Sequence, residues 1–81
     1  SSAQKKDLTV IVDATKKVRI DQNTMNLREL PDNIVLIGAK YDKNSPVYIK
    51  ADKSLIYDDV MFVLKSVKNA GFTKVALQTN G

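Results

Sequence analysis

Three aspartates in the second half of the sequence are the first candidates for chemistry. Asp52, Asp58 and Asp59 lie within the stretch IKADKSLIYDDVM. Carboxylates this close could hold a weakly bound divalent cation or act as general acid and base. However, adjacent helix residues point about 100° apart, and the chain has no histidine to complete a ligand set. A third interpretation is that Asp58 and Asp59 stabilise the start of a helix, and we favour it. We therefore predict no catalytic and no metal-binding residues.

The rest of the composition removes the other common kinds of active site. There is no cysteine and no histidine, so a serine has no imidazole base and a thiolate nucleophile is absent. The glycines, at positions 38, 71 and 81, form no phosphate-binding loop. We predict that the chain is not an enzyme and binds no cofactor.

The charge balance permits an anionic partner without requiring one. Lysine and arginine outnumber aspartate and glutamate by 13 to 9, which gives a net charge of +4. Tyr48 is the only aromatic residue in a predicted strand, and the basic residues form no single stripe, so nucleic-acid binding is an alternative that the sequence does not favour. Uninterrupted apolar runs such as Ile34–Ile37 are far shorter than the roughly 20 residues that cross a bilayer.

The elements that position these side chains begin after a polar lead-in. Residues 1–6 have no periodicity, and we interpret them as a disordered lead-in or the remainder of a linker. Residues 7–80 are predicted to form a single domain. Leu8–Val12 and Val18–Ile20 are β-branched and apolar, with turn residues between them, and predict an antiparallel hairpin.

A helix is predicted to follow. Asn26 and Glu29 have the spacing of a capping box, which places the helix start near Leu27, whereas Pro31 favours a later start with proline at the first position. Apolar residues then recur at helical spacing at Leu27, Leu30, Ile34, Ile37 and Tyr41. The run Ile34–Ile37 also fits a short buried strand, and Asn44–Pro46 would end the element.

The second half reads as strand, helix, strand. Val47–Ile49 is a short strand, and a helix runs from Ser54 or Tyr57 to Asn69. Its predicted apolar stripe consists of Tyr57, Val60, Met61, Leu64 and Val67. Gly71 followed by Phe72 ends this helix, and Lys74–Thr79 is the last strand.

Strand, helix and strand with short connections form a right-handed crossover, so the two flanking strands should be parallel. The element order is β-β-α-β-α-β. The predicted fold is α+β, a two-layer sandwich in which two helices cover one face of a small mixed β-sheet.

Residues from Val47 to Thr79 resemble the periplasmic domain of the ExbD/TolR family of biopolymer-transport proteins. The family shows a strand ending in Ala-Asp, a charged residue, a tyrosine that opens a helix, paired Val/Met positions, Ala-Gly-Phe and a Lys-Val-X-Leu strand. Here these places are occupied by Asp52, Lys53, Tyr57, Val60, Met61, Ala70, Gly71, Phe72, Lys74, Val75 and Leu77.

The resemblance implies a role in energy transduction across the bacterial envelope. Members couple the inner-membrane proton gradient, within an ExbB/TolQ-type membrane ring, to a TonB/TolA-type periplasmic protein for outer-membrane transport. It also implies a homodimer in the periplasm, anchored to the inner membrane by an N-terminal helix that this chain does not contain. A TolR-type role in peptidoglycan binding and cell-envelope integrity is the alternative within the family, and a basic nucleic-acid-binding domain is the alternative from another class.

The interaction surface is predicted from edge character. We expect the partner or dimer edge strand to be Leu8, Thr9, Val10, Ile11 and Val12, because an unpaired strand edge accepts an added strand. The family-signature residues are interpreted as mainly structural: Asp52, Tyr57, Gly71, Phe72 and Leu77. Among them, Tyr57 is expected to pack at the helix start and Leu77 to lie in the core.

Overall fold

The computed structural model describes residues 7–80. Its elements are β1 (Leu8–Val12), β2 (Lys17–Ile20), β3 (Asn23–Asn26), the 3₁₀ helix η1 (Leu27–Glu29), α1 (Leu30–Gly38), β4 (Val47–Asp52), α2 (Tyr57–Asn69) and β5 (Val75–Asn80). The predicted lead-in, residues 1–6, lies outside the described part. None of the helices in the described part has the length and apolar character needed to cross a membrane.

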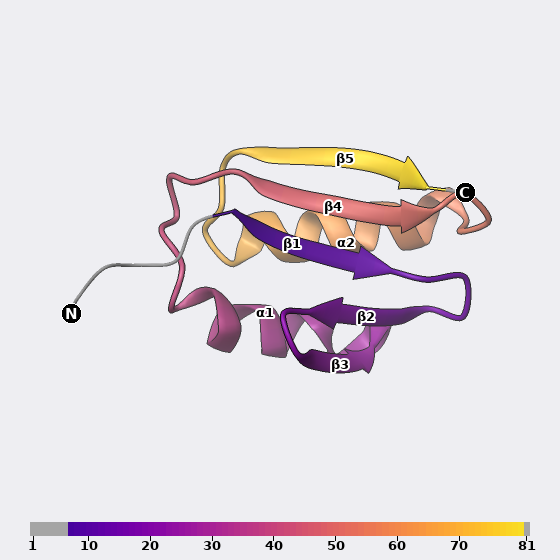
Figure 1. Ribbon diagram of the computed structural model, residues 1–81, viewed down its shortest axis with the longest axis horizontal. Helices are drawn as coiled ribbons and strands as arrows, with labels where there is room; N and C mark the ends of the chain where they lie inside the picture. The colour runs from indigo at the N-terminus through magenta and orange to yellow at the C-terminus, as the bar shows by residue number, and fades with distance from the viewer. Residues whose placement is uncertain (1–6, 81) are drawn as a thin grey trace.

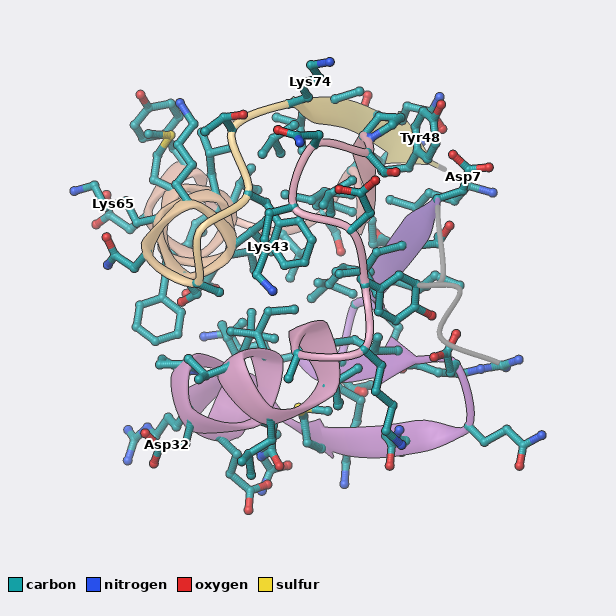
Figure 2. The ribbon with its side chains drawn as sticks, turned by 90° about the vertical axis from the view of Figure 1, so that its left-hand side faces the viewer. Asp7, Asp32, Lys43, Tyr48, Lys65 and Lys74 are labelled. Carbon is teal, nitrogen blue, oxygen red and sulfur yellow. The ribbon has the colours of Figure 1, made fainter. Side chains whose placement is uncertain are left out.

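The strands form one mixed five-stranded sheet in the order β3-β2-β1-β4-β5. β1 pairs antiparallel with β2, and β2 antiparallel with β3, whereas β1–β4 and β4–β5 are parallel (Figure 1). Figure 2 shows both helices on the same side of this sheet. The predicted α+β two-layer sandwich is confirmed, as are the hairpin and the parallel crossover.

The strand β3 is the element that the sequence did not reveal. Its residues are polar except for Met25, so the segment lacks an alternating apolar pattern. Met25 is nevertheless buried at 5% exposure and lies opposite Val18 of β2. Asp21 adopts a φ of 55° in the turn between β2 and β3, and this left-handed conformation allows a tight reversal without glycine.

Both predicted starts of the first helix occur in succession. The Asn26 backbone N–H donates to Glu29 Oε1 at 2.9 Å, at the start of η1. The α-helix then begins at Leu30 with Pro31 in its first turn, where proline's missing N–H has no helical partner to lose. The strand alternative is wrong, and α1 ends at Gly38, earlier than predicted.

The second helix is close to its prediction. It runs from Tyr57 to Asn69, and Gly71 follows with a φ of 107°, a conformation that ends helices and that side chains rarely tolerate. Phe72 is buried at 1% exposure in the same core cluster as Val67. Ser66 is also buried, and its hydroxyl donates to the Phe62 carbonyl at 2.8 Å, which satisfies this polar group within the helix.

The core lies between the sheet and the two helices. Alternate residues of the inner strands face the helices and are fully buried. The largest buried side chains are Phe72, Leu8, Ile20, Leu30, Ile34, Ile49, Val10, Val12, Val18, Val47, Val63 and Val67. The other face of the sheet has no helix over it among the described residues (Figure 2).

Candidate functional site

The three aspartates are held apart by local structure. Asp52 ends β4, and its Oδ1 accepts hydrogen bonds from the Ser54 hydroxyl at 2.7 Å and the Ser54 backbone N–H at 2.9 Å. These bonds favour the ionised form and lower the pKa of the Asp52 carboxyl below its ordinary value. Asp52 therefore stabilises the turn that leads to α2, because its Oδ1 accepts both hydrogen bonds from Ser54 in that turn.

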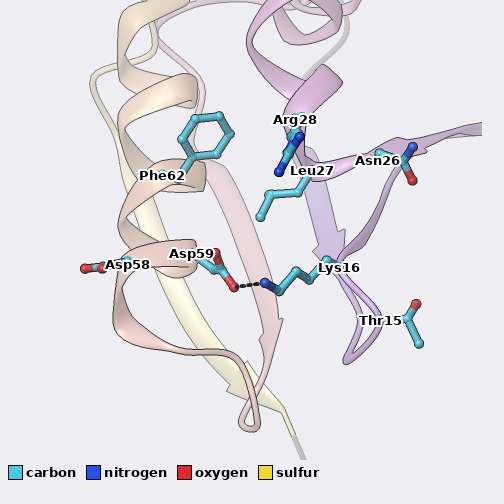
Figure 3. Close-up of a pocket in the computed structure, with 8 residues that line it drawn as sticks. All are labelled: Thr15, Lys16, Asn26, Leu27, Arg28, Asp58, Asp59 and Phe62. Carbon is cyan, nitrogen blue, oxygen red and sulfur yellow. Dashed lines mark ion pairs between the residues drawn. The ribbon is translucent and has the colours of Figure 1, made fainter.

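Asp58 and Asp59 both lie in the first turn of α2, as predicted. In Figure 3 the Asp59 side chain points across toward Lys16, whereas Asp58 points away from it. Lys16 Nζ lies 3.3 Å from Asp59 Oδ2, and the Asp59 side chain is only 17% exposed. The ion pair ties the turn between β1 and β2 to the start of α2.

A groove of about 670 Å³ surrounds this ion pair (Figure 3). Its walls are formed by Thr15, Lys16, Asn26, Leu27, Arg28, Asp58, Asp59 and Phe62. Within residues 7–80 no three acidic, histidine or cysteine side chains come together as metal ligands. The arrangement is that of a salt bridge between two elements, and it brings no general acid and base onto a common reacting position.

The predicted edge strand is wrong, because β1 lies in the middle of the sheet. Its two neighbours are β2 on one side and β4 on the other. The sequence contained a signal for this: Ile11 interrupts the alternation, so Leu8–Val12 is apolar on both faces, as central strands of sheets with parallel pairs often are. None of Leu8, Thr9, Val10, Ile11 and Val12 can receive an added strand without displacing a neighbour.

The edges of the sheet are β3 and β5. β5 is the longer, and the register pairs its Val75 with Val47 of β4. The Val47 N–H donates to the Lys74 carbonyl at 2.8 Å. In a parallel ladder alternate residues bond to the neighbouring strand, so the N–H and C=O groups of Val75, Leu77 and Thr79 point outward. They form an open row of donors and acceptors.

The side chains along this edge are only partly covered. Leu77 lies opposite Ile49 and shares its helix-facing side of the sheet, but it is 45% exposed whereas Ile49 is fully buried. The expectation that Leu77 belongs to the core is therefore wrong. β5 is the outermost strand of the described sheet, and no further strand of residues 7–80 lies beyond Leu77.

Tyr57 is also not the packing residue that was expected, because it is 75% exposed. The predicted stripe contains neither Val63 nor Ser66, whereas the buried residues of α2 are Val63, Ser66 and Val67. This rotates the helix relative to the prediction and leaves Tyr57 outside. Ile56, just before it, is 60% exposed. The α2 start and the end of β5 lie at the same end of the molecule (Figure 1).

The open face of the sheet carries charges of both signs. The register places Arg19 and Lys50 on either side of Ile11, so two cations lie about two strand spacings, roughly 10 Å, apart. Local sequence patterns do not predict that Arg19 and Lys50 lie close together, because the two residues are distant along the chain. Asp52 follows Lys50 on the same face, since it is two residues further along β4. The face is therefore not a basic stripe, and nucleic-acid binding gains little support.

Comparison with known proteins shows which family this chain resembles. The whole chain, residues 1–81, matches the profile of a family described as "Biopolymer transport protein ExbD/TolR". Two relatives, from Helicobacter pylori strains 26695 and J99, are each named "Putative biopolymer transport protein ExbD-like 1". Both are 42% identical to this chain over 79 residues, which is 98% of this chain. The chain spans 59% of the length of each relative.

Proposed function

Since the chain belongs to the ExbD/TolR family of biopolymer transport proteins, we propose that it is the periplasmic domain of an inner-membrane energy transducer. With an ExbB/TolQ-type ring, the whole protein would couple the proton gradient to a TonB/TolA-type partner for outer-membrane transport. Its role would be mechanical coupling without catalysis, and the protein would work as a homodimer.

The observation that carries this proposal is the open edge of β5. Three residues there, Val75, Leu77 and Thr79, direct outward backbone groups that no other strand of residues 7–80 pairs. An extended partner segment could add as a sixth strand through main-chain hydrogen bonds, which is a common mode of peptide recognition. The half-exposed Leu77 side chain would then pack beside an apolar side chain of the partner.

The other edge strand of the sheet, β3, is less suited to pairing with a partner than β5. β3 has only four residues, Asn23–Asn26, and three of them have polar side chains. Short polar edges are typical of strands that resist pairing with another chain. We therefore assign the partner contact to β5.

The test is an NMR titration of ¹⁵N-labelled protein with the periplasmic segment of a TonB-type protein. We expect the largest amide shifts in β5, centred on Leu77. In Leu77→Pro the outward N–H is lost while the bonds to β4 remain, so binding should fall at least about tenfold with the fold retained. Leu77→Ala is the matched control, because it removes the side chain but keeps the N–H, and it should bind more tightly than Leu77→Pro.

Three results would decide against the proposal. Shifts confined to β3, or equal binding by Leu77→Pro and the unmodified protein, would remove the β5 contact. A response to peptidoglycan fragments and none to the TonB-type segment would replace the coupling role by the TolR-type role in cell-envelope integrity.

A further inference from the structure

The outer side of α1 carries apolar side chains that no described element covers. Val35 is 56% and Leu36 70% exposed, the latter close to the value for Tyr57. On its inner side α1 buries Leu30 and Ile34 in the core. A helix with apolar residues on both sides is expected to be covered on both. The outer side is therefore expected to have an occupant.

The exposed residues of this segment follow helical spacing. Asp32, Val35, Leu36, Ala39 and Lys40 are the exposed positions from 30 to 40, and we call them the α1 face. They are separated by steps of three and one, so they form one stripe. Ala39 has helical φ and ψ of −61° and −23°, and the Lys40 N–H donates to the Ile37 carbonyl at 3.2 Å, so the chain leaves α1 in a tight turn that carries Lys40. An acid thus stands at one end, a base at the other, and apolar residues between them.

We propose that the α1 face is where two copies of this chain meet, with their helices antiparallel about a twofold axis near Leu36. In an isologous pair each contact occurs twice. Asp32 would lie opposite the partner's Lys40, and Lys40 opposite the partner's Asp32, while Leu36 of each copy packs against its counterpart. Neither charge has an ion-pair partner within residues 7–80, so both are available to a second copy.

A neighbouring groove enlarges the apolar contact. It has a volume of about 260 Å³, lies between α1 and α2, and is lined by Pro31, Val35, Phe62, Lys65, Ser66, Asn69 and Ala70. Phe62 is 39% exposed there. Because Val35 belongs to both surfaces, side chains of the second copy that pack on the α1 face would also reach the groove.

The size of the face sets the affinity. The nine residues of α1 span only about 14 Å, so the contact is smaller than a standard interface and we expect a dissociation constant of about 0.1 to 1 mM. This inference rests on the proposed function only for the idea that the working protein is a dimer. Its surface, α1, is separate from the β5 edge.

The test uses charge exchange in this 81-residue chain. Self-association is measured by sedimentation equilibrium and by the concentration dependence of amide shifts. Asp32→Lys and Lys40→Asp should each weaken it about tenfold or more, because two attractive pairs become repulsive. A mixture of the two variants should associate at least as well as the unmodified protein, because every contact then joins opposite charges. Lys50→Asp, on the open sheet face, is the control for net charge and should have no effect.

Each result of the self-association experiment either supports the α1 contact or overturns it. Recovery in the mixture, with shifts on Val35 and Leu36, supports the twofold contact. The inference is overturned if the chain shows no association up to about 2 mM, or if association is unaffected by the two variants. It is also overturned if association shifts only β5, which would assign dimerisation to the sheet edge. The fold of each variant is checked by its ¹⁵N spectrum, and binding of the TonB-type segment by Asp32→Lys shows whether the β5 proposal holds independently.

Discussion

Tyr41 makes a hydrogen bond that links two distant segments. Its hydroxyl donates to Asp21 Oδ2 at 2.6 Å, joining the chain after α1 to the turn between β2 and β3. Tyr41 is 4% exposed. Burial, and then the hydrogen bond to the Asp21 carboxylate, raise the pKa of Tyr41 to about 12. Both effects favour the neutral phenol in the folded protein.

This pKa predicts a loss of stability at alkaline pH. The folded pKa lies above the ordinary value of 10.0, so the contribution is fully present below pH 10 and is lost as pH rises through about 12. The loss should reach up to about 3 kcal/mol of unfolding free energy. The measurement is urea unfolding at several pH values for the protein and for Tyr41→Phe, because lysines titrate in the same range and the variant removes only the tyrosine contribution.

Tyr41→Phe should be about 1 kcal/mol less stable at neutral pH, because it loses the hydrogen bond to Asp21. The difference between the two proteins should shrink or reverse by pH 12. Parallel pH profiles from pH 9 to 12 would contradict this account. A second measurement is the phenolate absorbance of the unmodified protein minus that of Tyr41→Phe, which reports Tyr41 alone. If this difference developed at the ordinary tyrosine pKa of 10.0, the account would also be contradicted.

At the level of elements, the close contact between α1 and the segment after α2 leaves no room for a larger side chain at position 38. A Cβ added at Gly38 would lie 2.8 Å from Cε2 of the Phe72 ring. Lys43 covers the same place: its Nζ donates to the Gly38 carbonyl at 2.7 Å and lies 4.9 Å from the Phe72 ring centroid. Glycine is required at position 38 for space, since its backbone is helical.

Gly38→Ala should therefore destabilise the protein by about 1–3 kcal/mol, although alanine is the better helix former. Unfolding in urea measures this cost. The control is the double variant with Phe72→Leu, which removes the ring edge. If the clash is the cause, the combined cost will be smaller than the sum of the two single costs. Additive costs would assign the effect to something other than this contact.

The elements show how far local sequence determines structure. α2, the first hairpin and the parallel crossover were predictable because periodicity, turn residues and the Gly71 stop are local signals. The β3 strand was not, because its place in the sheet depends on Met25 meeting Val18 and on the turn at Asp21. The face of α2 was misjudged for a related reason: Ser66 is buried through a hydrogen bond to a backbone carbonyl, which residue polarity does not reveal.

At the level of the whole molecule, strand order determines where a partner can bind. Composition alone predicts β1 as an edge, yet the crossover through α1 places β4 beside β1, so β1 lies between β2 and β4. Which strand is outermost follows from the pairing of distant segments, and spacing along the chain does not specify it. The family resemblance was available from the sequence because it rests on local motifs from Asp52 to Leu77, whereas the β5 contact required the sheet.

The strand order makes a prediction about hydrogen exchange. β1 is the central strand of the five, and each of its two neighbours is itself paired on its far side, so the amides of β1 should be the best protected in the sheet. Along β5, protection should alternate: the amides of Ala76 and Gln78 face β4, whereas those of Leu77 and Thr79 face outward. Exchange at 25 °C, followed by NMR on dilute protein, should show Leu77 and Thr79 exchanging at least about tenfold faster than Ala76 and Gln78.

Adding the TonB-type segment should slow exchange at Leu77 and Thr79 and leave β3 unchanged, because a sixth strand would bond only to the outward groups of β5. The contrast between neighbouring residues is an internal control for local fraying, which would accelerate all four amides together. Uniform slow exchange along β5 in dilute protein would mean that another chain already covers this edge. Dimerisation would then belong to β5, and the α1 face would lose its proposed occupant.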